Sequence, residues 1–76
     1  MHISETERLL TEAQICILEG RQLIERQRKL IADLEASGQK TDAAQALLNS
    51  LIEAQRRHEE TRNRLLEKLN DERIDE

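Results

Sequence analysis

The feature that most constrains the fold is a seven-residue apolar repeat that is interrupted once, at residues 36–42. Gly38 is one of two glycines in a chain without proline, and glycine readily takes the left-handed conformation that closes a helix. A new helix can begin with Thr41 as its N-cap, or with Asp42 as the first residue of a capping box completed by Gln45. A stop and a start this close together predict an antiparallel helical hairpin, and together they disfavour the alternative of one long helix containing a weak glycine.

The bounds of the two helices follow from their end signals. Ser4 and Glu7 form a capping box, so the first helix is predicted to begin near Glu5 and to span about residues 5–36. The turn then covers 37–41 and the second helix about 42–70, which makes residues 1–76 a single all-α domain. Residues 71–76 hold four carboxylates and one arginine, a charge of −3 that opposes the helix dipole, so we expect an acidic tail that frays.

The apolar residues predict how the two helices pack. The first helix carries three neighbouring heptad rows, two of them bulky and one of mostly small residues. A turn centred near Gln39 places Gly20 opposite His58. The imidazole side chain would then fill the space that a glycine in the middle of a helix leaves. The residues expected to pack within the hairpin are Ala13, Gly20, Leu34, Ala44, Leu51, His58 and Leu65.

A three-row stripe is wider than one neighbouring helix can cover, so we expect the hairpin to associate with another copy. Two hairpins would form a four-helix bundle with two-fold symmetry, in which Gln27 sets the register. A higher homo-oligomer, or a monomer that awaits a partner helix, are the alternatives. The residues expected at the oligomer interface are Leu9, Cys16, Leu23, Gln27, Leu30, Leu48 and Leu69.

Composition excludes several classes of function. The chain has no aromatic residue and a net charge of −4, which disfavours a base-stacking or generally cationic nucleic-acid protein. It also lacks a glycine-rich phosphate loop, a paired nucleophile and base, and carboxylates arranged in a pocket. We therefore expect no catalytic residue, no cofactor and no metal, and the chain is interpreted as a non-enzymatic interaction module, a small adaptor or regulator.

The cysteine count and the apolar runs of the sequence bear on the cellular location of the protein. A single cysteine cannot form an internal disulfide, which suits a reducing cytoplasm. The N-terminal residues have neither a basic region nor an apolar core, so no signal peptide is expected, and no apolar run is long enough for a membrane span.

Two further hypotheses rest on smaller sets of residues. A central basic belt could hold an anion, an acidic protein partner or RNA, which would make the chain a nucleic-acid-associated regulator, although glutamates interleave with its members. Cys16 and His58 could bind metal or sense redox state across a dimer, but a buried structural role for both is favoured. The belt consists of Arg21, Arg26, Arg28, Lys29, Arg56 and Arg57.

A family resemblance covers roughly residues 16–66. Its motifs are Glu19-Gly20, Arg26-Gln27, Leu30-Ile31, Gly38 with Thr41, Ala44 with Leu47-Leu48, and His58 with Arg62. At this spacing the chain resembles a group of short alphaproteobacterial proteins to which no activity is assigned. The resemblance implies a bacterial, cytoplasmic protein and carries no activity across.

Overall fold

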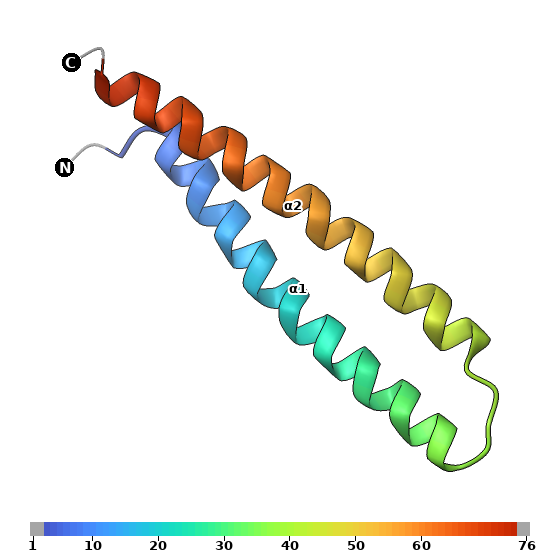
Figure 1. Ribbon diagram of the computed structural model, residues 1–76. Helices are drawn as coiled ribbons and strands as arrows, with labels where there is room; N and C mark the ends of the chain where they lie inside the picture. The colour runs from blue at the N-terminus through green and yellow to red at the C-terminus, as the bar shows by residue number, and fades with distance from the viewer. Residues whose placement is uncertain (1–2, 75–76) are drawn as a thin grey trace.

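The computed structural model describes residues 3–74, which form two long antiparallel helices joined by a short turn (Figure 1). Helix α1 spans Glu5–Ala36 and helix α2 spans Asp42–Ile74, and no strand occurs among these residues. The hairpin is a flat rod whose principal extents are 60, 21 and 12 Å. The predicted all-α hairpin is therefore confirmed, and α1 has the bounds expected for it.

The ends of α1 are closed by local hydrogen bonds that its sequence supplies. The Ser4 side chain accepts from the Glu7 backbone N–H at 3.1 Å, as a capping box requires. At the other end Gly38 has a φ of 70°, its N–H donates to Glu35 O, and the Gln39 N–H donates to Leu34 O at 2.9 Å. These two bonds make the Schellman motif, which satisfies carbonyls that a helix end would otherwise leave free.

Helix α2 begins where it was predicted to begin, with the first of the two N-cap alternatives, and it ends later than predicted. The Thr41 carbonyl accepts the first helical bond from Gln45 N at 2.8 Å, so Thr41 rather than Asp42 occupies the N-cap position. The second helix was predicted to end near residue 70, and in the structure residues 71–74 are helical as well. Thr6 Oγ1 donates to Glu72 Oε1 at 2.8 Å and so ties this end of α2 to α1, whereas residues 75–76 lie outside the described part of the chain.

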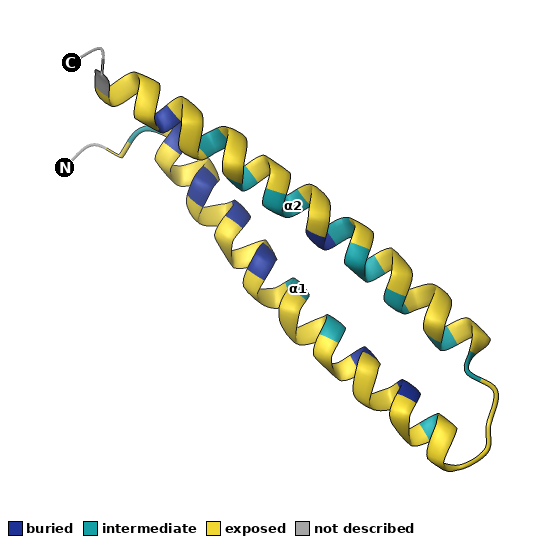
Figure 2. Cartoon of the chain, in the orientation of Figure 1, coloured by how far each residue is buried: buried dark blue, intermediate teal, exposed yellow. Residues whose placement is uncertain are grey.

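The core is a thin strip between the helices (Figure 2). Ile17 is its most enclosed apolar side chain, with an exposed fraction of 3%, and no described side chain is completely enclosed. Three polar residues share the strip with the apolar ones. The buried residues are Thr6, Leu10, Ala13, Ile17, Gln27, Ile31, Gln55 and Leu69.

The face that α2 turns toward α1 differs from the predicted face by one heptad row. Gln55 and Leu69 are buried, whereas Leu51, His58 and Leu65 are only half-buried. Half-buried Leu48 and Arg62 belong to the same row as Gln55 and Leu69, so this row lies nearest to α1.

Four sequence-based placements are corrected by the packing of the two helices. Gln55, not His58, fills the space over Gly20, because its amide can reach a backbone carbonyl of α1. Gln27 and Leu69, expected at an oligomer interface, are instead buried within the hairpin, and Leu48 is half-buried there.

Candidate interaction surface

A buried glutamine sets the close approach of the helices at mid-length. Gln55 Nε2 donates to the Ile17 carbonyl at 2.8 Å, across the gap from α2 to α1. A Cβ built on Gly20 would overlap Gln55 Oε1 and lie 2.9 Å from Cδ, so a side chain at position 20 would displace the end of the Gln55 side chain. Gln55 Oε1 itself is buried and has no hydrogen-bond partner among the described residues. The absence of a side chain at Gly20 therefore opens the backbone of α1 to a polar contact.

A second glutamine makes the reverse contact. Gln27 Nε2 donates to the Ala44 carbonyl at 2.9 Å, from α1 to α2. Both acceptor carbonyls lie inside helices, where each already accepts an intrahelical bond through its other lone pair. One amide thus extends from each helix to the other, and the pair fixes the rotation of both helices about their own axes.

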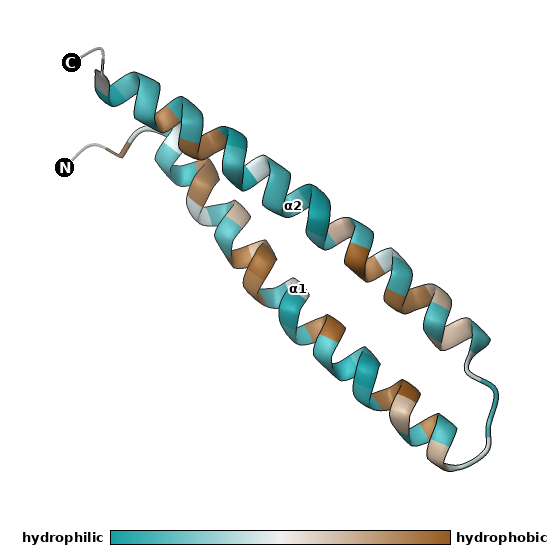
Figure 3. Ribbon diagram, viewed as in Figure 1, coloured by the Kyte–Doolittle hydropathy of each residue, from teal (hydrophilic) through white to brown (hydrophobic). Residues whose placement is uncertain are grey.

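Fixing that rotation leaves a continuous apolar surface uncovered, which we call the Cys16 flank, while Leu18 and Leu66 are exposed outside it. The expected interface residues Leu9, Leu23 and Leu30 are exposed to 37%, 47% and 46%, and Leu47 of α2 is exposed to 50%. Hydrophobic positions recur along both helices in Figure 3. The flank comprises Leu9, Cys16, Leu23 and Leu30 of α1 and Leu47, Leu51, Ala54, His58, Thr61 and Leu65 of α2.

The floor of the Cys16 flank is hollowed between the helices. Two adjoining pockets of about 160 and 270 Å³ both contain Cys16 and His58 in their walls, so they form one continuous depression. Leu51 and Ala54 line the first pocket, and Thr61 and Leu65 line the second. The half-buried residues Leu51, His58 and Leu65, predicted to pack within the hairpin, thus also present part of their surface on this flank.

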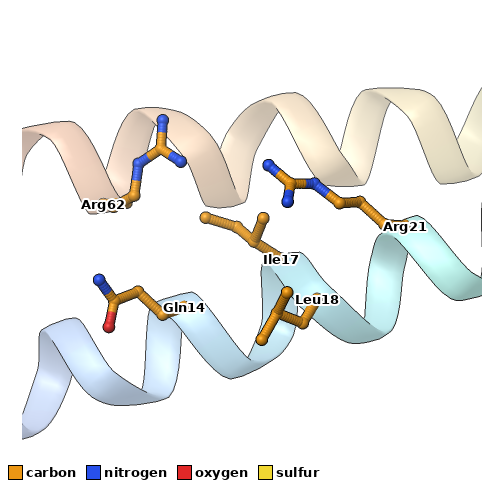
Figure 4. Close-up of a pocket in the computed structure, with 5 residues that line it drawn as sticks. All are labelled: Gln14, Ile17, Leu18, Arg21 and Arg62. Atoms are coloured by element: carbon orange, nitrogen blue, oxygen red, sulfur yellow. The ribbon is translucent and has the colours of Figure 1, made fainter.

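The opposite flank is more polar. A pocket of about 290 Å³ has Ile17 and Leu18 in its wall, and the guanidinium groups of Arg21 and Arg62 face it from the two helices (Figure 4). Arg62 also donates to Asn63 Oδ1 from two of its nitrogens, each at 3.2 Å. The pocket can therefore offer positive charge beside an apolar wall.

The predicted basic belt is only partly brought together. Of its six members, Arg21 alone lines the Arg62 pocket, and Arg26, Arg28, Lys29, Arg56 and Arg57 are exposed elsewhere on the two helices. Arg62 was missing from the predicted belt. Its position one heptad after Gln55 is the signal that places it at the hairpin seam.

Cys16 and His58 do lie near each other, since they share two pockets. Cys16 is exposed rather than buried, because its row points along the open flank and not into the hairpin. Within residues 3–74 no group of three or more histidine, cysteine or acidic side chains is placed to hold a metal ion. The Cys16–His58 pair on its own therefore offers two ligands of the several that a metal site needs.

The chain defines an all-α helical hairpin with one open apolar flank. Comparison with protein-family models, curated proteins and solved structures gave no match. The resemblance to short alphaproteobacterial proteins stays a prediction. Neither helix of the described residues combines the length and apolarity needed to cross a membrane.

Proposed function

We propose that the protein is a non-enzymatic helical interaction module that works as a homodimer, a four-helix bundle made of two hairpins. The observation that carries this proposal is the Cys16 flank, where leucines on both helices remain about half exposed. An apolar surface that runs along a whole rod is unusual for a protein that stays alone in water. A second hairpin laid on this flank would remove these leucines from solvent.

The thin core supports the same proposal. A chain of 76 residues buries only about 60% of the surface of its unfolded form, which leaves little margin for stability. Here the apolar core consists of Leu10, Ala13, Ile17, Ile31 and Leu69. Covering the Cys16 flank would add a second apolar layer. Complete burial of an exposed leucine contributes about 1.5–3 kcal/mol, so each of these half-exposed leucines would contribute roughly half of that. A cytoplasmic location, where thiols stay reduced, suits an exposed cysteine on such an interface.

Sedimentation equilibrium tests the proposal directly, with two matched leucine variants. We expect the wild type to be a dimer at tens of micromolar and Leu23→Lys, on the Cys16 flank, to be a monomer. Leu18→Lys is the control, because Leu18 is exposed to 57% on the other flank and should leave the dimer intact. A wild-type monomer, or equal effects of the two variants, would show that the Cys16 flank does not mediate self-association.

A second candidate function rests on the Arg62 pocket. Arg21 and Arg62 direct two positive charges toward one space, an arrangement that suits a phosphate of a nucleic acid. The net charge of −4 weighs against this function. Binding to random DNA or RNA that weakens as salt rises, and that is lost in Arg21→Ala/Arg62→Ala, would support it. A lack of binding at low salt would exclude it.

A further inference from the structure

We propose that the two-fold axis of the dimer runs parallel to the helices, so that α1 of each copy packs antiparallel against α2 of the other. This inference rests on the proposed function, because it specifies how two copies meet through the Cys16 flank. It is carried by the charged rows that border the flank. These rows differ in sign between the two helices.

At mid-height of the rod, the charged row of α1 beside the Cys16 flank is acidic, and the corresponding row of α2 is basic. Glu12 and Glu19 lie in walls of the two pockets of the Cys16 flank, one row beyond Cys16. Arg57 and Arg64 lie one row beyond Ala54 and Thr61, at the matching position of α2. The complete rows are Glu5, Glu12, Glu19, Arg26 and Asp33 on α1 and Ala43, Ser50, Arg57, Arg64 and Asp71 on α2.

The register of the hairpin sets these charges at equal heights along the rod. Gly20 lies level with Gln55, and Thr6 lies level with Glu72. Glu19 is therefore close in height to Arg57, and Glu12 to Arg64 one heptad further along both helices. Within one copy the two rows lie on opposite edges of the flank, and the ion pairs found among the described residues join Arg8 only to Glu5 and Glu12.

Rotation by 180° about an axis parallel to the helices leaves every residue at the same height along the rod. It brings the α1 edge of one copy next to the α2 edge of the other. Glu19 then meets Arg57 of the second copy, and Glu12 meets Arg64 of the second copy. The symmetry repeats each contact, so four pairs of opposite charge border the dimer. The remaining members of the rows set Arg26 beside Ser50, Asp33 beside Ala43, and Glu5 beside Asp71, a like-charged pair at the open end.

The apolar rows match under the same operation at three of their four levels, and at the fourth, near the open end, Leu9 lies beside Lys68 of the second copy. Leu30 meets Leu47 of the second copy, Leu23 meets Ala54, and Cys16 meets Thr61. The large side chain of Leu23 thus faces a small one, as interdigitating layers require. The flank of a rod measuring 60 by 21 Å is also large enough for the roughly 800 Å² per partner that a stable interface takes.

The competing axis is perpendicular to the helices and sets each helix against its own copy. Centred on the apolar row from Leu9 to Leu30, this axis passes close to the height of Glu19. It would then bring Glu19 against Glu19 and Arg57 against Arg57. The perpendicular axis also sets Glu12 beside Arg26 of the second copy, so it gives two pairs of opposite charge where the parallel axis gives four. The like charges at the centre of the interface disfavour it further.

Charge reversal distinguishes the two axes. With the parallel axis, Glu19→Arg or Arg57→Glu alone creates two like-charged contacts per dimer, and each should weaken self-association about tenfold by sedimentation equilibrium. The double variant Glu19→Arg/Arg57→Glu restores both contacts and should recover the wild-type affinity. With the perpendicular axis a single reversal only exchanges one like pair for another. Glu25→Arg, an exposed change off the flank, is the control of equal charge.

Disulfide formation supplies a readout that does not depend on affinity. In the triple variant Cys16→Ala/Leu30→Cys/Leu47→Cys, the parallel axis brings the two new thiols together across the dimer, so oxidation should give a covalent dimer. A bridge within one chain needs Cα atoms closer than about 7 Å, which helices packed about 8–10 Å apart do not allow for outward-facing positions. Cys16→Ala/Leu30→Cys should not cross-link.

The outcomes separate this inference from the proposed function. A dimer that neither responds to single charge reversals nor forms the disulfide overturns the parallel axis and leaves the homodimer standing. A wild-type monomer overturns both. Weakening by each single variant, recovery in the double variant and a covalent dimer on oxidation together establish the parallel axis.

Discussion

At the scale of single residues, the hairpin is organised by two glutamines that occupy buried positions. An isolated amide buried without partners is unfavourable, but Gln27 and Gln55 each donate to a carbonyl of the opposite helix. Leucine at either position would pack equally well in several rotations of the helix. A hydrogen bond to a defined carbonyl is compatible with only one rotation of the helix about its axis. These residues therefore contribute more to the specificity of helix packing than to net stability.

The contact of Gly20 with Gln55 gives the first prediction. Gly20→Ala gains about 1 kcal/mol of helix propensity but forces the Gln55 amide from its position, so we expect a net loss of stability in the wild-type background. In a Gln55→Ala background the added methyl meets no amide, and the same change should stabilise by about 1 kcal/mol. The double-mutant cycle, measured by urea unfolding, should therefore give a coupling larger than about 1 kcal/mol and up to about 2 kcal/mol. Additive effects would show that the glutamine does not require the glycine.

The Gly20 contact also shows what sequence could and could not predict at this scale. A mid-helix glycine predicted a close approach at this height, and the structure places one there. The predicted partner, His58, was wrong because it followed from a turn centred near Gln39, whereas the packing of the two helices sets Gln55 opposite Gly20. Only the three-dimensional register shows that its amide reaches the Ile17 carbonyl.

At the scale of elements, the turn is specified by hydrogen bonds that its own residues make. Gly38 is the only described residue with a positive φ, and a Cβ added to it would meet nothing within 4 Å. Its requirement for glycine is therefore conformational and not steric. This is why the turn could be located from sequence, since the left-handed closing residue and the helix-starting Thr41 are local signals.

The second prediction separates conformation from space at the turn. Gly38→Ala should lower the free energy of unfolding by about 1 kcal/mol, because alanine is strained at a φ of 70°. Gly38→Asn should cost less, because asparagine tolerates the left-handed region better. Thermal unfolding followed by circular dichroism would rank the three proteins. Equal stability of all three would mean that the turn does not depend on this conformation.

The third prediction concerns the end of α2, which the sequence led us to expect frayed. That expectation rested on the acidic residues at the end of the chain. In the structure, the hydroxyl of Thr6 in α1, a residue with an exposed fraction of 3%, donates a hydrogen bond to Glu72 in α2. Thr6→Val keeps the shape of the side chain and removes this donor. We expect faster amide hydrogen exchange over about residues 69–74, by roughly three- to tenfold, as the last turns open more readily.

Thr11→Val provides the matched control for Thr6→Val. Thr11 is exposed, and its hydroxyl donates only to the Glu7 carbonyl of its own helix. This variant should leave amide exchange at the end of α2 unchanged. If Thr6→Val also leaves it unchanged, the contact with Glu72 does not hold the end of the helix.

At the scale of the whole molecule, the hairpin has more apolar surface than one copy can bury. The repeat predicted a stripe wider than two helices need, and exposed Leu9, Leu23 and Leu30 now lie along the Cys16 flank. The open leucines of α1 could be predicted from its repeat, but those of α2 could not, because the rotation of α2 depends on the glutamine contacts. That rotation places Leu69 inside the hairpin and leaves Leu47 exposed on the flank, whereas Gln27 is buried on α1 because its amide donates to the Ala44 carbonyl.

If the bundle supplies much of the stability, unfolding must depend on concentration. Unfolding that releases two chains is opposed by mass action, so the thermal midpoint rises as the protein is concentrated. For a dimer of two 76-residue chains we expect a rise of about 5–10 °C between roughly 1 and 100 µM. Leu23→Lys should unfold at one lower temperature throughout this range, and Leu18→Lys should follow the wild type. A wild-type midpoint that does not move with concentration would show that each hairpin carries its own stability, since a partner bound only in the folded state always shifts that equilibrium.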